Sequence, residues 1–180
     1  MAETAKPRSL KPQSPKHRSP IAPGKPAPAF TLVDQHGKPH TLADYQSRPV
    51  VLFFYPKDLT SGCTDEACQF RDLLPRFKRS KAAVFGVSIL GPKSKAKFAE
   101  KEGLTYPLLA DDRVNENKKP DPAICQKYGV WVEKSMYGKK YMGIARTTYL
   151  IDANGKVAKR WDKVKVPGHA EEVLEAVKAF

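Results

Sequence analysis

Two cysteines five residues apart, Cys63 and Cys68, are the side chains of this sequence best suited to chemistry. They follow an apolar run over residues 50–55 that predicts a strand buried on both faces, and residues 63–74 predict a helix. A cysteine in the first turn of a helix lies near unpaired backbone N–H groups and the positive end of the helix dipole, which both favour the thiolate. Because the thiolate is the nucleophile, Cys63 is a candidate for covalent chemistry. A buried, inert cysteine is the alternative.

Helix geometry limits what Cys63 and Cys68 can do together. Five residues along an α-helix separate two Cα atoms by about 8–9 Å, whereas a disulfide rarely bridges more than about 7 Å. The two thiols are therefore either unrelated or form a switch in which the first helical turns unwind. A metal site is less favoured, because none of the four histidines is near either cysteine in the sequence.

Strand and helix patterns alternate along the rest of the chain. The predicted strands cover residues 50–55, 83–90, 107–110, 130–133, 144–151 and 156–164. The predicted helices cover residues 63–74, 93–102, 123–128 and 169–180. A hairpin is expected over residues 30–42, a basic loop over residues 134–141, and a kink or helix end at Pro75. This order predicts an α/β fold with helices on both faces of a sheet.

The chain is basic, with 32 Lys and Arg against 19 Asp and Glu and a formal net charge of +13. Such a charge attracts phosphates, but no nucleic-acid-binding module is visible, so we expect no specific nucleic-acid partner. The lysines within residues 93–101 alternate with Ala and Phe, as on the exposed face of an ordinary helix.

The N-terminal residues differ in composition from the rest of the chain. Seven of the 16 prolines lie in residues 1–28, together with Lys, Ser and Arg and few large apolar side chains. This composition predicts a disordered basic, Pro-rich tail over residues 1–22 and one folded domain over residues 23–180. Neither a signal peptide nor an apolar run of about 20 residues is present, so we expect no membrane association and a cytoplasmic location.

The residues around Cys63 resemble the active-site signature of the peroxiredoxins, which are thiol-dependent peroxidases on a thioredoxin-like fold. The signature is Pro56-x-x-x-Thr60-x-x-Cys63, and a helix cysteine five residues later is similar to the peroxiredoxin Q (bacterioferritin comigratory protein) branch. The resemblance spans about residues 21–180. Its further matches are residues 54–58, 128–131, 136–139 and 146–152. Ser61 departs from the family, which commonly has proline there.

The resemblance implies a role for each residue that would meet the peroxide. Cys63 would attack the peroxide as a thiolate and become a sulfenic acid. Arg146 and Thr60 would hydrogen-bond the thiolate and the peroxide, while Pro56 and Gly62 would line the pocket. Without the resemblance, Arg146 would be interpreted as a surface ion-pair residue and Thr60 as a helix cap.

The resemblance also implies how the oxidised enzyme is recycled. Cys68 would resolve the sulfenic acid as an intramolecular disulfide, which a thioredoxin-type reductant would reduce. Cys125 is expected to be a buried packing residue, and a second resolving thiol is the alternative.

We therefore expect a monomeric, thioredoxin-like α/β domain, with a central mixed β-sheet and helices on both faces, that reduces hydrogen peroxide and organic hydroperoxides. This chemistry requires no metal or organic cofactor. The alternative enzyme class is a thiol–disulfide oxidoreductase, although its Cys-x-x-Cys spacing is missing. The alternative outside enzymes is a basic nucleic-acid-associated protein with incidental cysteines.

Overall fold

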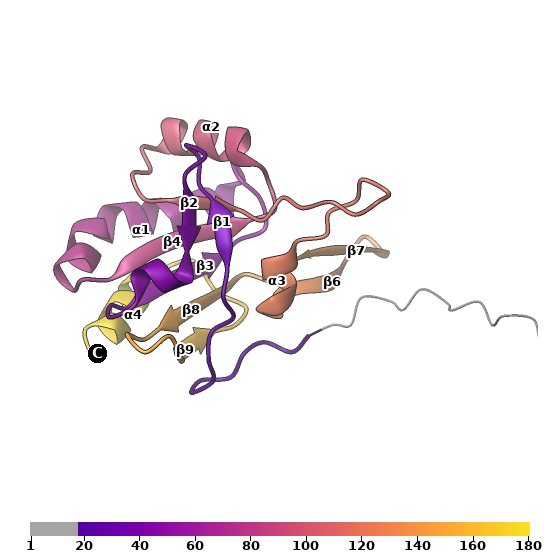
Figure 1. Cartoon of the computed structure of the whole chain (residues 1–180). Coiled ribbons are helices and arrows are strands. Elements are labelled where there is room, and N and C mark those ends of the chain that lie inside the picture. Colours follow the sequence, from indigo (N-terminus) through magenta and orange to yellow (C-terminus); the bar gives the residue numbers. More distant parts are fainter. Residues whose placement is uncertain (1–17) are drawn as a thin grey trace, which may run out of the picture.

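A seven-stranded mixed sheet forms the centre of the computed structural model, which describes residues 18–180 (Figure 1). The strand order is β2-β1-β5-β4-β3-β8-β9. The strands are β1 (Thr31–Val33), β2 (Pro39–Thr41), β3 (Val50–Phe54), β4 (Ala83–Ser88), β5 (Leu108–Ala110), β8 (Thr147–Ile151) and β9 (Val157–Trp161). β3, β4 and β5 are parallel, whereas β8 is antiparallel to β3 and β1 is antiparallel to β5. The mixed sheet agrees with the predicted fold class.

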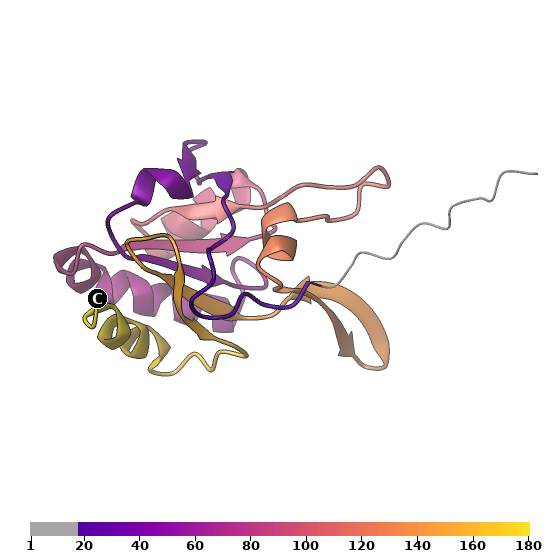
Figure 2. The ribbon, with the colours of Figure 1, turned by 60° about the horizontal axis from the view of Figure 1, so that its bottom comes forward.

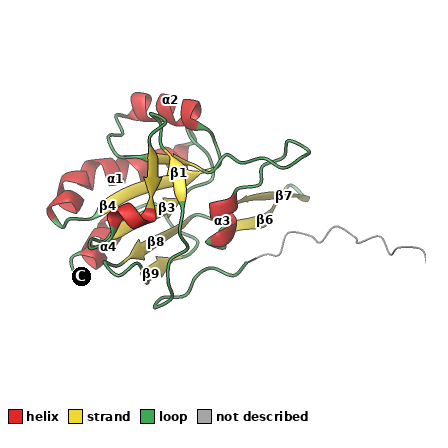
Figure 3. Cartoon of the chain, in the orientation of Figure 1, coloured by secondary structure: helices red, strands yellow, loops and turns green. Residues whose placement is uncertain are grey.

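Helices cover both faces of this sheet (Figure 3). The helices are α1 (Ser61–Arg79), α2 (Pro92–Glu102), α3 (Ala123–Lys127), α4 (His169–Val177) and a 3-10 turn, η1 (Leu42–Tyr45). Val51 and Phe53 of β3 pack in one apolar cluster with α1, α2 and α4. Leu52 and Phe54 point to the opposite face and pack with α3. Successive residues of a strand point to opposite faces, which explains why all of β3 is buried.

The expected basic loop over residues 134–141 is wrong, because these residues belong to a hairpin. Strand β6 (Trp131–Met136) pairs antiparallel with β7 (Lys139–Ile144), and Figure 2 shows this hairpin projecting from the body of the protein. Tyr137 and Gly138 have φ angles of 50° and 73°, so both turn residues are in the left-handed conformation that suits a two-residue hairpin. Tyrosine rarely adopts this conformation, which is why the sequence did not indicate the turn.

Two helices also differ from expectation. α1 continues through Pro75 to Arg79, because Phe77 in its last turn is fully buried and its packing outweighs the missing backbone hydrogen bond. α2 ends at Gly103 as predicted, with φ of 62° at that glycine. Lys95, however, is fully buried and does not lie on an exposed face.

The last residues of the predicted tail over residues 1–22 contact the folded domain. The Ile21 N–H donates to the Tyr149 hydroxyl at 3.1 Å, and the Ile21 carbonyl accepts from Arg160 Nη1 at 2.8 Å. Gly129 has φ of 71°, and a Cβ there would lie 2.5 Å from the backbone nitrogen of Pro20. Residues 18–22 therefore pack on the domain, and the rest of the predicted tail, residues 1–17, lies outside the described residues. Within residues 18–180, no helix is both long and apolar enough to span a bilayer.

Deleting residues 1–22 should destabilise the domain more than deleting residues 1–17, because only the longer deletion removes the two hydrogen bonds of Ile21. Each such bond contributes about 1 kcal/mol to stability. A loss of about 2 kcal/mol should lower Tm by about 4–8 °C in a domain of this size. Thermal unfolding of the two truncated proteins measures the difference, and equal midpoints would contradict this packing.

Candidate active site

Cys63 lies in the first turn of α1, directly after the loop that leaves the buried strand β3. Thr60 is the N-cap residue with extended backbone angles, and its carbonyl accepts the Thr64 N–H at 2.8 Å. The Cys63 side chain is buried, with 2% of the residue exposed. Cys63 therefore lies in the helical turn whose backbone N–H groups have no partner within the helix.

Sheet pairing brings Arg146 to this sulfur from 83 residues away. β8 pairs with β3 so that Thr147 faces Phe54, and this places Arg146 beside the end of β3. Arg146 Nη2 donates to Cys63 Sγ at 3.3 Å. The structure therefore places the predicted cation, Arg146, in contact with the predicted nucleophile, Cys63. Because a guanidinium has several N–H donors, it can hydrogen-bond a negatively charged sulfur and a neighbouring oxygen at the same time.

Glu66, one turn after Cys63, binds the other side of the same guanidinium. Its Oε2 accepts from Arg146 Nη1 at 2.5 Å, and only 1% of its side chain is exposed. Burial raises the pKa of Glu66 to about 7, and the positive charge of Arg146 opposes this rise. Its second oxygen, Oε1, is buried without a hydrogen-bond partner among residues 18–180. The pairing of Glu66 with Arg146 was not predicted, since an acid in the first turns of a helix is common.

The other residues of the predicted site have different environments. The Thr60 hydroxyl is exposed and donates to the Lys57 carbonyl at 2.9 Å, so it does not bond the sulfur in this structure. A Cβ on Gly62 would lie 3.4 Å from Arg146 Nη2, and glycine therefore leaves space beside the guanidinium. Pro56 is half-buried at the start of the loop, and its shielding role stays a prediction.

The three cysteines are free thiols in three environments. Cys68 is half-buried in the second turn of α1, and its thiol donates to Glu102 Oε2 at 3.9 Å. Burial raises the pKa of Cys68. Because α1 is continuous, Cys63 and Cys68 keep the separation of about 8–9 Å expected for helix geometry. Cys125 is fully buried in the cluster on the opposite face of the sheet, which favours a packing role.

Lys134 of β6 is a further charged residue near the site that the sequence did not indicate. Desolvation lowers the pKa of Lys134, the charge of Arg146 lowers it further, and Cys63 raises it. Strand β6 therefore adds a second positive charge to the surroundings of the sulfur.

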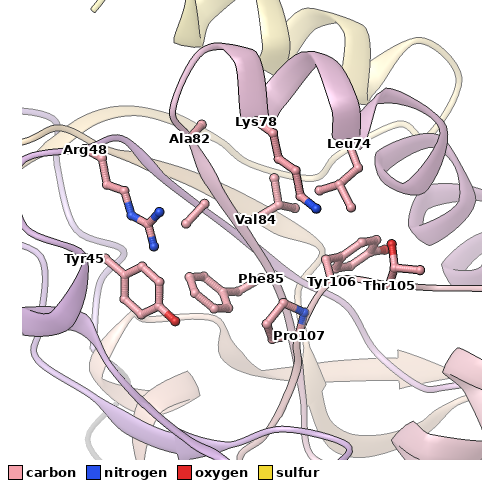
Figure 4. A pocket seen from close by; sticks show the side chains of 11 residues that line it. Tyr45, Arg48, Leu74, Lys78, Ala82, Val84, Phe85, Thr105, Tyr106 and Pro107 are labelled. Carbon is pink, nitrogen blue, oxygen red and sulfur yellow. The ribbon is translucent and has the colours of Figure 1, made fainter.

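A separate cavity of about 260 Å³ lies at the other end of α1 and β4 (Figure 4). Tyr45, Phe85 and Tyr106 line it, and Arg48 and Lys78 project over it. It contains none of the predicted site residues. Within residues 18–180, no three His, Cys, Asp or Glu side chains gather as a metal site.

Replacing Glu66 by Gln should flatten the pH dependence of stability. Folded Glu66 holds its proton up to about pH 7, whereas the unfolded chain releases it near the ordinary value of 4.5. Folding therefore takes up a proton in this interval, and stability falls as the pH rises through it, by on the order of 3 kcal/mol. Urea unfolding at pH 5 and pH 8 should show a smaller difference for Glu66→Gln than for the wild type.

The matched control for this experiment is Asp65→Asn, which changes an exposed acid on the same helical turn. It should keep the wild-type difference between the two pH values. An unchanged difference in Glu66→Gln would show that Glu66 does not titrate in this range.

Comparison with known proteins supports one family. The AhpC/TSA family matches residues 23–160. Peroxiredoxin Bcp of Bacillus subtilis is 43% identical over 86% of this chain and 94% of its own length. Peroxiredoxin Bcp of Escherichia coli is 41% identical over 89% of this chain and 97% of its own length. A mutant PrxQ structure from Xylella fastidiosa has a TM-score of 0.81 and 38% identity over 90% of this chain and 98% of that one.

A Xanthomonas campestris Peroxiredoxin Q structure has a TM-score of 0.76 and 41% identity, covering 83% of this chain and 90% of that one. A further solved structure concerns the alkyl peroxide reduction activity of the Xanthomonas campestris bacterioferritin comigratory protein. These relatives confirm the family resemblance and the thioredoxin-like fold. The chain therefore belongs to the AhpC/TSA family of peroxiredoxins, within its peroxiredoxin Q (Bcp) branch.

Proposed function

We propose that this protein reduces hydrogen peroxide and organic hydroperoxides through Cys63, that Cys68 is the resolving thiol, and that a thioredoxin-type dithiol is the reductant. The observation that carries the proposal is the Arg146 guanidinium 3.3 Å from the Cys63 sulfur at the start of α1. The alkyl peroxide reduction described for the Xanthomonas campestris relative supports the substrate class.

In the first step, the Cys63 thiolate attacks the terminal oxygen of the peroxide. An S–O bond forms, the O–O bond breaks, and the leaving hydroxide or alkoxide takes up a proton and departs as water or alcohol. Negative charge moves from the sulfur to the leaving oxygen, and the Arg146 guanidinium, which already donates to the sulfur, would stabilise this charge. The Thr60 hydroxyl would have to turn from the Lys57 carbonyl to the peroxide.

In the second step, the Cys68 thiolate attacks the sulfur of the Cys63 sulfenic acid. The S–S bond forms, the S–O bond breaks, and the hydroxide leaves as water with the proton that Cys68 released. The first turns of α1 must unwind, because helix geometry keeps the Cα atoms of Cys63 and Cys68 about 8–9 Å apart. A disulfide requires a Cα–Cα distance below about 7 Å. One chain carries both thiols, so a monomer suffices, and a cytoplasmic dithiol would then reduce the disulfide.

The experiment that tests this function is peroxide-dependent oxidation of NADPH through thioredoxin reductase and thioredoxin. We expect turnover with hydrogen peroxide and with an alkyl hydroperoxide, and no turnover for Cys63→Ser. Peroxide-dependent turnover that survives in Cys63→Ser would overturn the proposal.

Replacing Arg146 by Met should slow the oxidation of Cys63 by about 100-fold, because loss of one donor aimed at developing charge has effects of this size. Arg146→Lys should recover only part of the rate, since it keeps the charge but loses the planar fork. Arg113→Met is the control, because Arg113 is exposed and pairs with Asp121 away from the site. Stopped-flow rates that are equal in all of these proteins would remove Arg146 from the mechanism.

Replacing Cys68 by Ser should separate the two steps. The variant should consume one equivalent of peroxide, because Cys63 and Arg146 remain, and then turn over poorly with thioredoxin. Cys125→Ala is the matched control and should turn over normally, since Cys125 lies on the opposite face of the sheet. A Cys63–Cys125 disulfide in the mass spectrum of the oxidised wild type would assign resolution to Cys125 instead.

A further inference from the structure

A buried ion pair lies beside the loop that leads to Cys63. Asp58, in the middle of the loop over residues 56–60, is paired with Lys95 of α2, and Lys95 Nζ is 3.3 Å from Asp58 Oδ1. Both side chains are fully buried. Lysine and aspartate are almost never buried unless they are paired, so this pair is a specific feature of the fold that the sequence did not reveal.

Three further side chains complete the network around the pair. Asp58 Oδ1 accepts from the Tyr55 hydroxyl at 2.5 Å and from Ser88 Oγ at 3.3 Å, and Asp58 Oδ2 accepts from Ser94 Oγ at 2.8 Å. Lys95 Nζ also donates to Ser88 Oγ at 2.5 Å and to the Tyr55 hydroxyl at 3.2 Å. All three ammonium hydrogens of Lys95 therefore have an acceptor.

The network connects the loop to three elements of the fold. Tyr55 follows the last residue of β3, Ser88 is the last residue of β4, and Ser94 and Lys95 lie in the first turn of α2. Asp58 is the one loop residue that reaches all of them. The loop over residues 56–60 is thus fixed at its centre, between the strand that precedes it and the Cys63 helix that follows.

The loop needs such an anchor because its backbone is strained. Leu59, directly after Asp58, has φ of 63°, in the left-handed region that a residue other than glycine rarely adopts. The next residue, Thr60, caps α1 and would meet the peroxide in the proposed function. A loop released from Asp58 could relax at Leu59, and this would move the Thr60 hydroxyl relative to the Cys63 sulfur.

We propose that the Asp58–Lys95 pair is a positioning element for the peroxidase reaction. It holds the backbone of the loop over residues 56–60 in the position from which the Thr60 hydroxyl turns from the Lys57 carbonyl to the peroxide. The inference rests on the proposed function. Neither charged group touches the sulfur, so the pair acts through the loop. Removing Lys95 leaves a buried carboxylate without its counter-charge, which is unfavourable in a well-packed site.

The test compares two reactions of the Cys63 thiol. Oxidation by hydrogen peroxide needs the loop to orient the peroxide, whereas alkylation by iodoacetamide needs only an accessible thiolate. In Lys95→Met, the peroxide rate constant should fall by about 10-fold or more, because small displacements of reacting groups have effects of this size. The alkylation rate, followed by mass spectrometry of the peptide that contains Cys63, should stay within about twofold of the wild type.

Three further variants make the comparison decisive. Lys97→Met removes an exposed lysine from the same helix and should change neither rate. Val157→Ala creates a cavity in the core on the other face, and it shows what lower stability alone does to both rates. Ser94→Ala removes one hydrogen bond to Asp58, and its peroxide rate should fall by about threefold, an effect of less than 1 kcal/mol on the barrier.

The outcomes distinguish this inference from the proposed function. If the wild type does not react with peroxide, the proposed function fails. If the wild type reacts and Lys95→Met slows peroxide and iodoacetamide equally, or slows neither, the positioning role is overturned. If Lys95→Met does not fold, Ser94→Ala decides: a loss confined to peroxide supports the role, and two unchanged rates overturn it.

Discussion

The contact between the Arg146 guanidinium and the Cys63 sulfur depends on the pairing of two central strands. β3 delivers the chain to the start of α1, and β8 pairs antiparallel with β3 in a register that places Arg146 beside that start. Glu66 then binds the other side of the guanidinium from the next turn of α1. The site therefore lies where a buried sheet and the N-terminus of a helix meet. The close packing of β3 fixes the positions of Cys63 and Arg146 relative to each other.

α1 imposes opposite demands on the two proposed steps. Its first turn supplies the polar environment of Cys63, but the same regular helix keeps Cys68 too far away for a disulfide. Side chains of α2 contact both the loop before α1 and the Cys68 thiol. Ser94 and Lys95 donate to Asp58 in the loop, and Glu102 accepts from the thiol. In the proposed mechanism, the reaction with peroxide and the formation of the disulfide would use two conformations of the first turns of α1, and the contacts from α2 would stabilise the first conformation.

Local sequence patterns predicted the elements but not the partners of buried charges. The apolar run over residues 50–55 and the glycine at 103 correctly indicated β3 and the end of α2. Glu66 and Lys95 were missed because a charged residue is buried only when a distant partner such as Arg146 or Asp58 meets it. The match to a known signature, rather than periodicity, was what singled out Arg146, since its proximity to Cys63 arises from strand pairing over 83 residues.

The most direct test that Cys63 is the thiol which reacts with peroxide compares proteins that differ only in the cysteines they keep. The quantity measured is their rate of peroxide consumption. A double variant, Cys68→Ser with Cys125→Ala, keeps Cys63 alone, and its single-turnover rate constant should stay within about twofold of the wild type. Cys63→Ser keeps the other two cysteines, and it should consume peroxide no faster than free cysteine does at the same pH. Consumption at the wild-type rate by Cys63→Ser would contradict the account.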